Sequence, residues 1–289
     1  MVHMPKTMKR KLSNMFANFF WGVEDQKKKR HWRAWNKLCV PCDEGGVGVR
    51  DLDEVQQVMF LKFGWQLLTQ DSLWAKFFCA KCVKNSHVSL MQEGRFGSQF
   101  WMNAFQGIPL LLQKSQWKVR QENVSLRYDK FTEDGPLCSR VNLITEPLIR
   151  VQDLFSTRSA CDIIRVKFPK MDNVDWIWNN LLPGKISIYM WKAYFNCLSV
   201  DENVRKLGIP IVSCCNCCET HHCEYLNHVL GSGDFASALW RKVYAKMGFP
   251  FVAIQGWKER SAAWFRLASR QSQVGILTGL LLSIVVWRL

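Results

Sequence analysis

A dense cluster of cysteine and histidine residues constrains this chain more than any other feature of its sequence. Five of the 12 cysteines and three of the 6 histidines fall between Cys214 and His228. Thiolate sulfur and imidazole nitrogen are the ligands that a tetrahedral zinc site uses. Apolar residues at helical spacing over 186–198 and 235–247 predict a helix on either side of the cluster. We therefore expect a loop between two helices that a zinc ion can fasten.

The size and charge of the chain indicate a folded protein whose partners carry negative charge. A chain of 289 residues with 48% hydrophobic residues can bury one large or two ordinary cores. Its formal net charge of +15 favours partners rich in phosphate. The first residues lack the apolar stretch of a secretory signal, so we expect an intracellular protein of the nucleus or cytoplasm, with free or metal-bound thiols rather than disulfides.

The apolar stretch Gly275–Val286 near the end of the chain raises the question of a membrane anchor. It is twelve residues long, whereas a membrane-spanning helix needs about 20 apolar residues. A buried helix or strand is the expected structure, and a membrane is not an expected partner. A tail-anchored membrane protein stays as an alternative.

The first third of the chain predicts two helices separated by a turn. Apolar residues from Met8 to Phe20 recur at helical spacing, with Lys9 expected on the opposite, solvent-facing side. Glycines over 44–50 demand a turn, after which Asp51 or Asp53 can cap the next helix. The apolar face expected for that second helix consists of Val55, Met59, Phe63 and Leu67.

Several stretches in the same order resemble the region that follows the polymerase core in plant LINE-type (non-LTR) retroelement reverse transcriptases. They are KKKRHWRAWNKLCVPCDEGGVGVRDL at 27–52, STRSACDIIR at 156–165, WIWNNLLPGKISIYMWKAYFNCLSVDENVRKLGIP at 176–210 and HVLGSGDFASALW at 228–240. The similarity covers most of residues 8–288, and its most specific block, 176–240, resembles the zinc-binding domain of these reverse transcriptases.

This resemblance implies a mainly α fold. It divides the chain into a helical thumb-like segment at 1–82, after a missing polymerase core, and an eroded connector at 83–155. A small α-rich zinc-binding-like domain follows at 156–250, with the Cys/His loop between two helices. An apolar segment at 251–289 then precedes a missing ribonuclease H domain.

The resemblance also implies a ligand set for the zinc ion. The family pattern is a Cys-x2-Cys pair, a later His and a Cys about five residues beyond that His. Cys215, Cys218 and His228 fit the first three positions, whereas the fourth falls at Gly233, which has no ligand atom. Three neighbours remain open as the fourth ligand, and a loop with free thiols is the alternative to a zinc site. These neighbours are Cys223, Cys217 and His222.

Catalytic residues of the expected kinds are missing from the sequence. A reverse transcriptase holds two metal ions with paired aspartates, and no Asp-Asp pair occurs in this chain. The endonuclease and ribonuclease H domains of the family also have no counterpart here. We therefore expect a protein that is not an enzyme.

A basic segment with interspersed tryptophans predicts weak, non-specific binding of RNA or DNA. Its charges can contact phosphates while Trp32 and Trp35 stack on bases, although a solvated face with both rings turned into the core is the alternative. The basic residues are Lys27, Lys28, Lys29, Arg30 and Arg33. An intact retroelement polymerase is a further expected partner. The predicted function is thus a non-catalytic, retroelement-derived zinc-binding domain protein, and an inert translated relic is the alternative.

Overall fold

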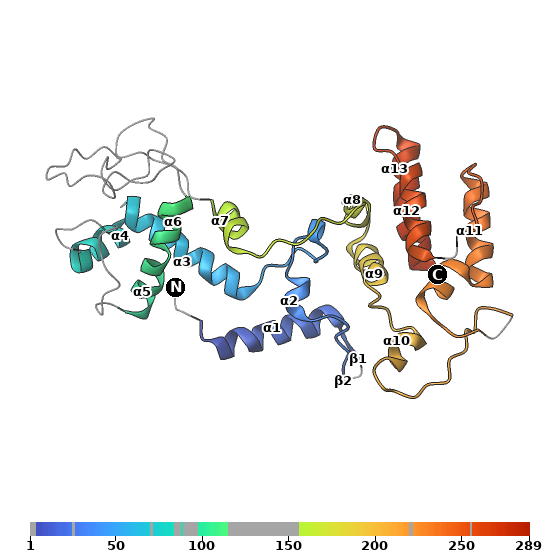
Figure 1. The fold of residues 1–289 in the computed structure, drawn as a ribbon, viewed down its shortest axis with the longest axis horizontal. Helices are drawn as coiled ribbons and strands as arrows, with labels where there is room; N and C mark the ends of the chain where they lie inside the picture. Colours follow the sequence, from blue (N-terminus) through green and yellow to red (C-terminus); the bar gives the residue numbers. More distant parts are fainter. Residues whose placement is uncertain are drawn as a thin grey trace. The chain divides into compact units, whose positions relative to one another are not determined.

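The computed structural model describes residues 4–24, 27–69, 72–83, 88, 98–114, 156–219, 222–254 and 256–289. The fold is mainly α, as the sequence predicts (Figure 1). It forms two compact units, one of Met1–Phe16 with Arg50–Lys167 and one of Ala17–Val49 with Phe168–Leu289. Each unit thus combines two separate stretches of the sequence. The division at residues 82, 155 and 250 stays a prediction, and most of the expected connector lies outside the described residues.

The first unit is built around helix α3 (Leu52–Thr69), which packs on its helical neighbours α4 (Leu73–Phe78), α5 (Gln99–Gln106), α6 (Ile108–Lys114) and α7 (Thr157–Ile164). A π-helical turn, η2 (Cys79–Val83), continues α4. Helix α1 (Lys6–Trp21) has residues in both units. The expected cap of α3 is confirmed, because the Asp53 backbone N–H donates a 2.8 Å hydrogen bond to Asp51 Oδ1.

The apolar face predicted for α3 is confirmed only in part, at Leu67 and at the half-buried Phe63, which packs against the same core. Of its four members Leu67 alone is buried, and the core-facing positions are Val58, Leu61, Gly64 and Leu67, at steps of three. Gly64 sets this face because helix α5 approaches it closely. A Cβ at Gly64 would lie 2.9 Å from the Ala104 carbonyl oxygen. Gly64 is therefore part of the packing surface of α3, although a hydrophobicity pattern does not identify a glycine as a core-facing residue.

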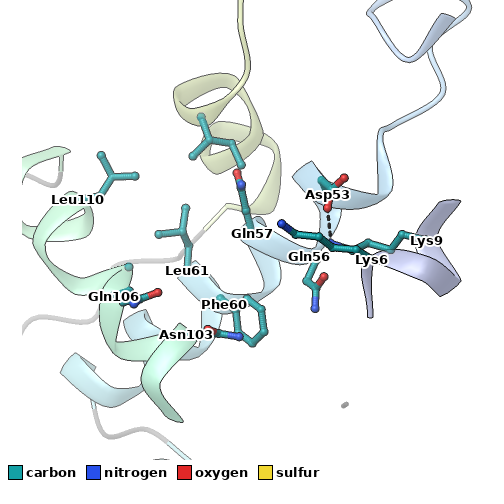
Figure 2. A pocket seen from close by; sticks show the side chains of 12 residues that line it. Lys6, Lys9, Asp53, Gln56, Gln57, Phe60, Leu61, Asn103, Gln106 and Leu110 are labelled. Carbon is teal, nitrogen blue, oxygen red and sulfur yellow. Dashed lines mark hydrogen bonds and ion pairs between the residues drawn. The ribbon is translucent and has the colours of Figure 1, made fainter. Parts of the chain in front are cut away.

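The outward position expected for Lys9 is also wrong. Its side chain is buried and its ammonium group pairs with the carboxylate of Asp53 on α3. The pair lies at a pocket of about 400 Å³, which amide side chains of α3 and α5 line (Figure 2). The amides are those of Gln56, Gln57, Asn103 and Gln106. The ion pair explains why a lysine takes a buried position on this helix.

The second unit contains the Cys/His cluster. Its first stretch holds the antiparallel pair β1 (Val23–Glu24) and β2 (Lys27–Lys28), helix α2 (Trp35–Leu38) and the 3-10 turn η1 (Cys42–Glu44). The second stretch begins with α8 (Val174–Ile177), α9 (Gly184–Tyr194) and α10 (Asp201–Arg205). It continues with the π-helical turn η5 (His228–Ser232), α11 (Asp234–Lys246), α12 (Trp257–Leu267) and α13 (Gln273–Arg288).

Tryptophans dominate the core of the second unit, and the indole N–H groups of three of them tie its parts together. Trp191 on α9 donates a 3.1 Å hydrogen bond to the carbonyl oxygen of Gly45 in the glycine turn. Trp240 on α11 donates to Leu230 at 2.8 Å, and Trp264 on α12 donates to Thr278 at 2.7 Å. Because a buried indole N–H needs a partner, these bonds fix the glycine turn, η5 and α13 against the core.

Helix α13 contains the apolar stretch Gly275–Val286 and packs beside α12 (Figure 1). Most of its residues from Thr278 to Val286 are buried, so the expectation of a buried helix or strand is confirmed. Gly279 lies directly against the Trp176 ring, since a Cβ there would come within 2.3 Å of it. Among the helices of the described ranges, none combines the length and the apolar character needed to cross a membrane.

Candidate metal centre

The structure brings together the three residues that the resemblance assigns as zinc ligands. The ligand atoms of Cys215, Cys218 and His228 all lie within 4.8 Å of one another. The two Sγ atoms are 3.8 Å apart, and Cys218 Sγ is 3.3 Å from His228 Nε2. In the described part of the chain this is the one such group of three metal-ligating side chains.

Two irregular stretches of chain hold the cysteine pair in place. The Cys215 backbone N–H donates a 2.8 Å hydrogen bond to the carbonyl oxygen of His222, and the Glu224 N–H donates to Ser213 Oγ at 2.7 Å. The stretch 213–215 therefore lies beside 222–224. The turn that begins at Asn216 then carries Cys218 back toward Cys215.

The π-helical turn η5 places His228 and Gly233 next to each other. The Gly233 backbone N–H donates a 2.8 Å hydrogen bond to the His228 carbonyl oxygen, five residues earlier, which is the hydrogen bond of a π turn. A Cβ at Gly233 would lie 3.1 Å from His228 Nε2. The position that the resemblance gives to the fourth ligand thus faces the site. Sequence reasoning missed this turn, because its residues have no period that distinguishes it from an ordinary loop.

Burial and neighbouring groups shape the chemistry of the three donors. Burial, together with His222, lowers the pKa of His228, while Asp234 opposes this. A lowered pKa favours the neutral imidazole, the form that offers a lone pair to a metal ion. Burial raises the pKa of the Cys215 thiol, and the backbone N–H of Cys217, hydrogen-bonded to it, acts in the opposite direction. Such a hydrogen bond stabilises a thiolate, the form that binds zinc.

The three residues left open as the fourth ligand take different positions. The His222 ring lies against the His228 ring, with 5.6 Å between their centroids. Cys217 and Cys223 are exposed thiols. His221, the remaining histidine of the cluster, lies outside the described residues.

The basic segment divides into exposed and packed residues. Lys29 and Arg30 are exposed, whereas the guanidinium of Arg33 lies 4.0 Å from the Phe195 ring centroid and hydrogen-bonds to the Gly45 carbonyl oxygen. Burial lowers the pKa of Arg33. Trp32 and Trp35 pack against the core of the second unit. Lys27 and Lys28 form β2, and their side chains are outside the described parts of the structure.

Comparison with known proteins connects this site to a family. Residues 155–240 match the family described as zinc-binding in reverse transcriptase. A "Putative ribonuclease H protein" of Arabidopsis thaliana is 31% identical over 83% of this chain and 48% of its own length. An "Uncharacterized mitochondrial protein" of the same plant is 29% identical over 37% of this chain and 70% of its own length. No solved structure matches the chain.

These matches confirm the predicted resemblance to the zinc-binding domain of reverse transcriptases, over residues 155–240. They also require a correction. The expectation that the protein is not an enzyme, which assumed a missing ribonuclease H domain, is contradicted by the relative that aligns with 83% of the chain and is named for that activity. The chain spans about half of that relative, 48% of its length.

Proposed function

Because residues 155–240 carry the zinc-binding domain of reverse transcriptases, we propose that the second unit is a zinc-fastened module of a retroelement protein that handles RNA and DNA. In this proposal Cys215, Cys218 and His228 hold one zinc ion. The observation that carries it is the convergence of their ligand atoms within 4.8 Å.

The donor set fits zinc in kind and in setting. Two sulfurs and an imidazole nitrogen are typical zinc ligands, and Cys215 and His228 are both buried, which limits competition from water. The position of Gly233 is consistent with the same interpretation, because this residue lies close beside His228 Nε2, where a Cβ would come within 3.1 Å of that atom. The proposed ion is structural: it would supply a cross-link and would organise the chain around it.

The cross-link would stabilise the core of the second unit, because His228 is only two residues from a core residue, Leu230. His228 begins η5, and Leu230 in the same turn is fully buried and accepts the hydrogen bond from Trp240 on α11. Fastening His228 to the cysteine pair would therefore stabilise the start of α11. It would also anchor the stretches 206–219 and 222–225, which have little regular structure of their own.

Nucleic acid is the partner that we propose for the exposed charges. Lys29 and Arg30 are exposed near the start of the unit, and the whole chain has a formal net charge of +15. Such charges contact phosphates without reading the sequence, so the binding would be weak, non-specific and sensitive to salt. We leave Arg33 out of this surface because it packs on Phe195. An intact retroelement polymerase remains a proposed protein partner.

We further propose that the module works in the same protein as ribonuclease H chemistry, or beside it. The support for this proposal is the name of the relative that aligns with 83% of the chain. A zinc-fastened module that binds phosphates would then hold an RNA–DNA hybrid near the enzyme that cleaves it. Assaying the full-length protein of this relative, with and without the region matching residues 155–240, would measure that contribution.

The zinc proposal is tested by elemental analysis of the purified full chain. We expect about one zinc ion per chain, with most of it lost in Cys218→Ser and in His228→Ala. Cys217→Ser is the matched control, because it removes an exposed thiol from the same turn. A wild-type chain without zinc, or equal zinc content in wild type and Cys218→Ser, would refute the proposed site.

A further inference from the structure

We propose that His222 supplies the fourth ligand of the zinc site, in place of the residue that the family carries at the position of Gly233. This inference rests on the proposed function, since it completes the same site. It gives the chain a set of two cysteines and two histidines. In sequence order the ligands would be Cys215, Cys218, His222 and His228.

The backbone of His222 is fixed beside the first ligand. Its carbonyl oxygen accepts the 2.8 Å hydrogen bond from the Cys215 backbone N–H. The Glu224 N–H, which donates to Ser213 Oγ at 2.7 Å, holds the same two stretches together two residues further on. The main chain at His222 therefore stays next to the cysteine pair whatever its side chain does.

The ring of His222 already lies against the ring of an assigned ligand. Its centroid is 5.6 Å from that of His228. With Zn–N bonds of about 2 Å, two imidazoles on one tetrahedral zinc have ring centroids roughly 5 Å apart. The ligand atoms of His222 are not among those that lie within 4.8 Å of one another, so its ring must turn to reach the site. Because the His222 side chain is exposed, it can turn without breaking buried contacts.

The two cysteines that compete for this role are less well placed. Cys217 lies inside the Cys-x2-Cys turn, where its backbone N–H is hydrogen-bonded to the Cys215 thiol and its own thiol is exposed. Cys223 follows His222 directly in a segment that is not helical. The Cys223 thiol is exposed, and the ring contact between this stretch and His228 is made by His222.

This ligand also explains how the site tolerates Gly233. A structural zinc ion needs four protein ligands, and three would leave a position open to water. Position 233 faces the site but offers no donor atom. The imidazole of His222 would supply the fourth donor that position 233 lacks and would complete the coordination shell.

The test uses the zinc-loaded full chain and two readouts. X-ray absorption at the zinc edge counts sulfur and imidazole ligands, and competition with a chelator measures affinity. We expect two sulfurs and two imidazoles in the wild type. In His222→Ala we expect one imidazole and an affinity lower by at least about tenfold, since even the partners of ligands cost that much when removed. Cys223→Ser, the matched control, should leave both readouts unchanged.

Repeating the His222→Ala substitution in a Gly233→Cys protein distinguishes a zinc ligand from a residue that only packs near the site. In Gly233→Cys the new thiol takes the fourth position, so adding His222→Ala should no longer lower the affinity. A wild-type site with one imidazole, or unchanged affinity in His222→Ala, overturns the role of His222 while the three-ligand site stands. A wild-type chain that holds no zinc overturns both proposals together.

Discussion

The backbone N–H of Gly233 donates a 2.8 Å hydrogen bond to the carbonyl oxygen of His228. This π-type bond makes residues that are five apart in the sequence into neighbours in space. It gives a physical reason for a spacing of five between a histidine ligand and the next ligand, because an ordinary α-helical turn would bring position 232 there instead. The chain keeps the turn although position 233 has no side chain.

Replacing Gly233 with cysteine should therefore strengthen zinc binding. The new Cβ would lie 3.1 Å from His228 Nε2, where a thiol can reach the site, but also 2.7 Å from the His228 carbonyl oxygen. We expect the metal-free variant to lose about 1–3 kcal/mol of stability through crowding. The zinc-loaded variant should regain it. Thermal unfolding with and without zinc measures both terms.

Gly233→Ala is the control for this prediction, since it adds the same Cβ without a ligand atom. It should lose the same stability and regain none of it with zinc. Equal responses of Gly233→Cys and Gly233→Ala to zinc would show that position 233 does not face the metal.

Replacing Gly279 with alanine should destabilise the second unit. A Cβ there would meet the Trp176 ring at 2.3 Å, so α13 or α8 must shift. Overpacking of this kind costs about 1–3 kcal/mol. The measurement is the free energy of unfolding in denaturant. Gly184→Ala is the matched control, because a Cβ there meets nothing within 4 Å, and it should be neutral or slightly stabilising.

Replacing Arg260 with alanine should also destabilise the unit. This arginine is 2% exposed, donates to the Ile254 carbonyl oxygen at 2.5 Å and lies near the rings of Trp240 and Phe251. Its removal leaves a cavity and releases the segment before α12, at a cost of about 2–4 kcal/mol. Arg266→Ala, on the exposed side of the same helix, should change stability little. Equal effects of the two variants would contradict the packing described.

Neutralising two exposed basic residues should flatten the salt dependence of RNA binding. With Lys29 and Arg30 both changed to alanine, the slope of log K against log salt should fall by about 0.7 for each phosphate contact that is lost. Lys242 and Lys246, exposed on α11, provide a control pair with the same change in charge. If both pairs flatten the slope equally, the first two residues have no special contact with nucleic acid.

The sequence predicts the elements around the metal site better than it predicts their faces. The Cys/His cluster and the helix that begins near Phe235 follow from residue type and local spacing, which act over a few residues. The choice of Cys215, Cys218 and His228 within that cluster comes from the resemblance to the family. The face of α3 and the burial of Lys9 depend on partners distant in the sequence, namely Ala104 against Gly64 and Asp53 beside Lys9. A pattern of hydrophobic residues contains no information about such partners.

Local sequence patterns also do not reveal that residues 17–49 fold with the second unit. Residues 17–49 belong to the same compact unit as the metal site, because Trp191 donates to Gly45 and Arg33 packs on Phe195. In the sequence Arg33 is one charge in a basic segment. Its guanidinium packs on the rings of Trp191, on α9, and Phe195, just after α9, which are more than a hundred positions later in the sequence.

Amide hydrogen exchange of the full chain, zinc-loaded and after chelation, tests the central claim most directly. If zinc fastens the cysteine pair to η5, protection over 213–218 and 228–233 should fall together on chelation. Cys217→Ser should behave like the wild type, whereas Cys218→Ser should resemble the chelated protein with or without zinc. Equal exchange over both segments in the loaded and chelated wild type would contradict the claim that a metal ion holds them together.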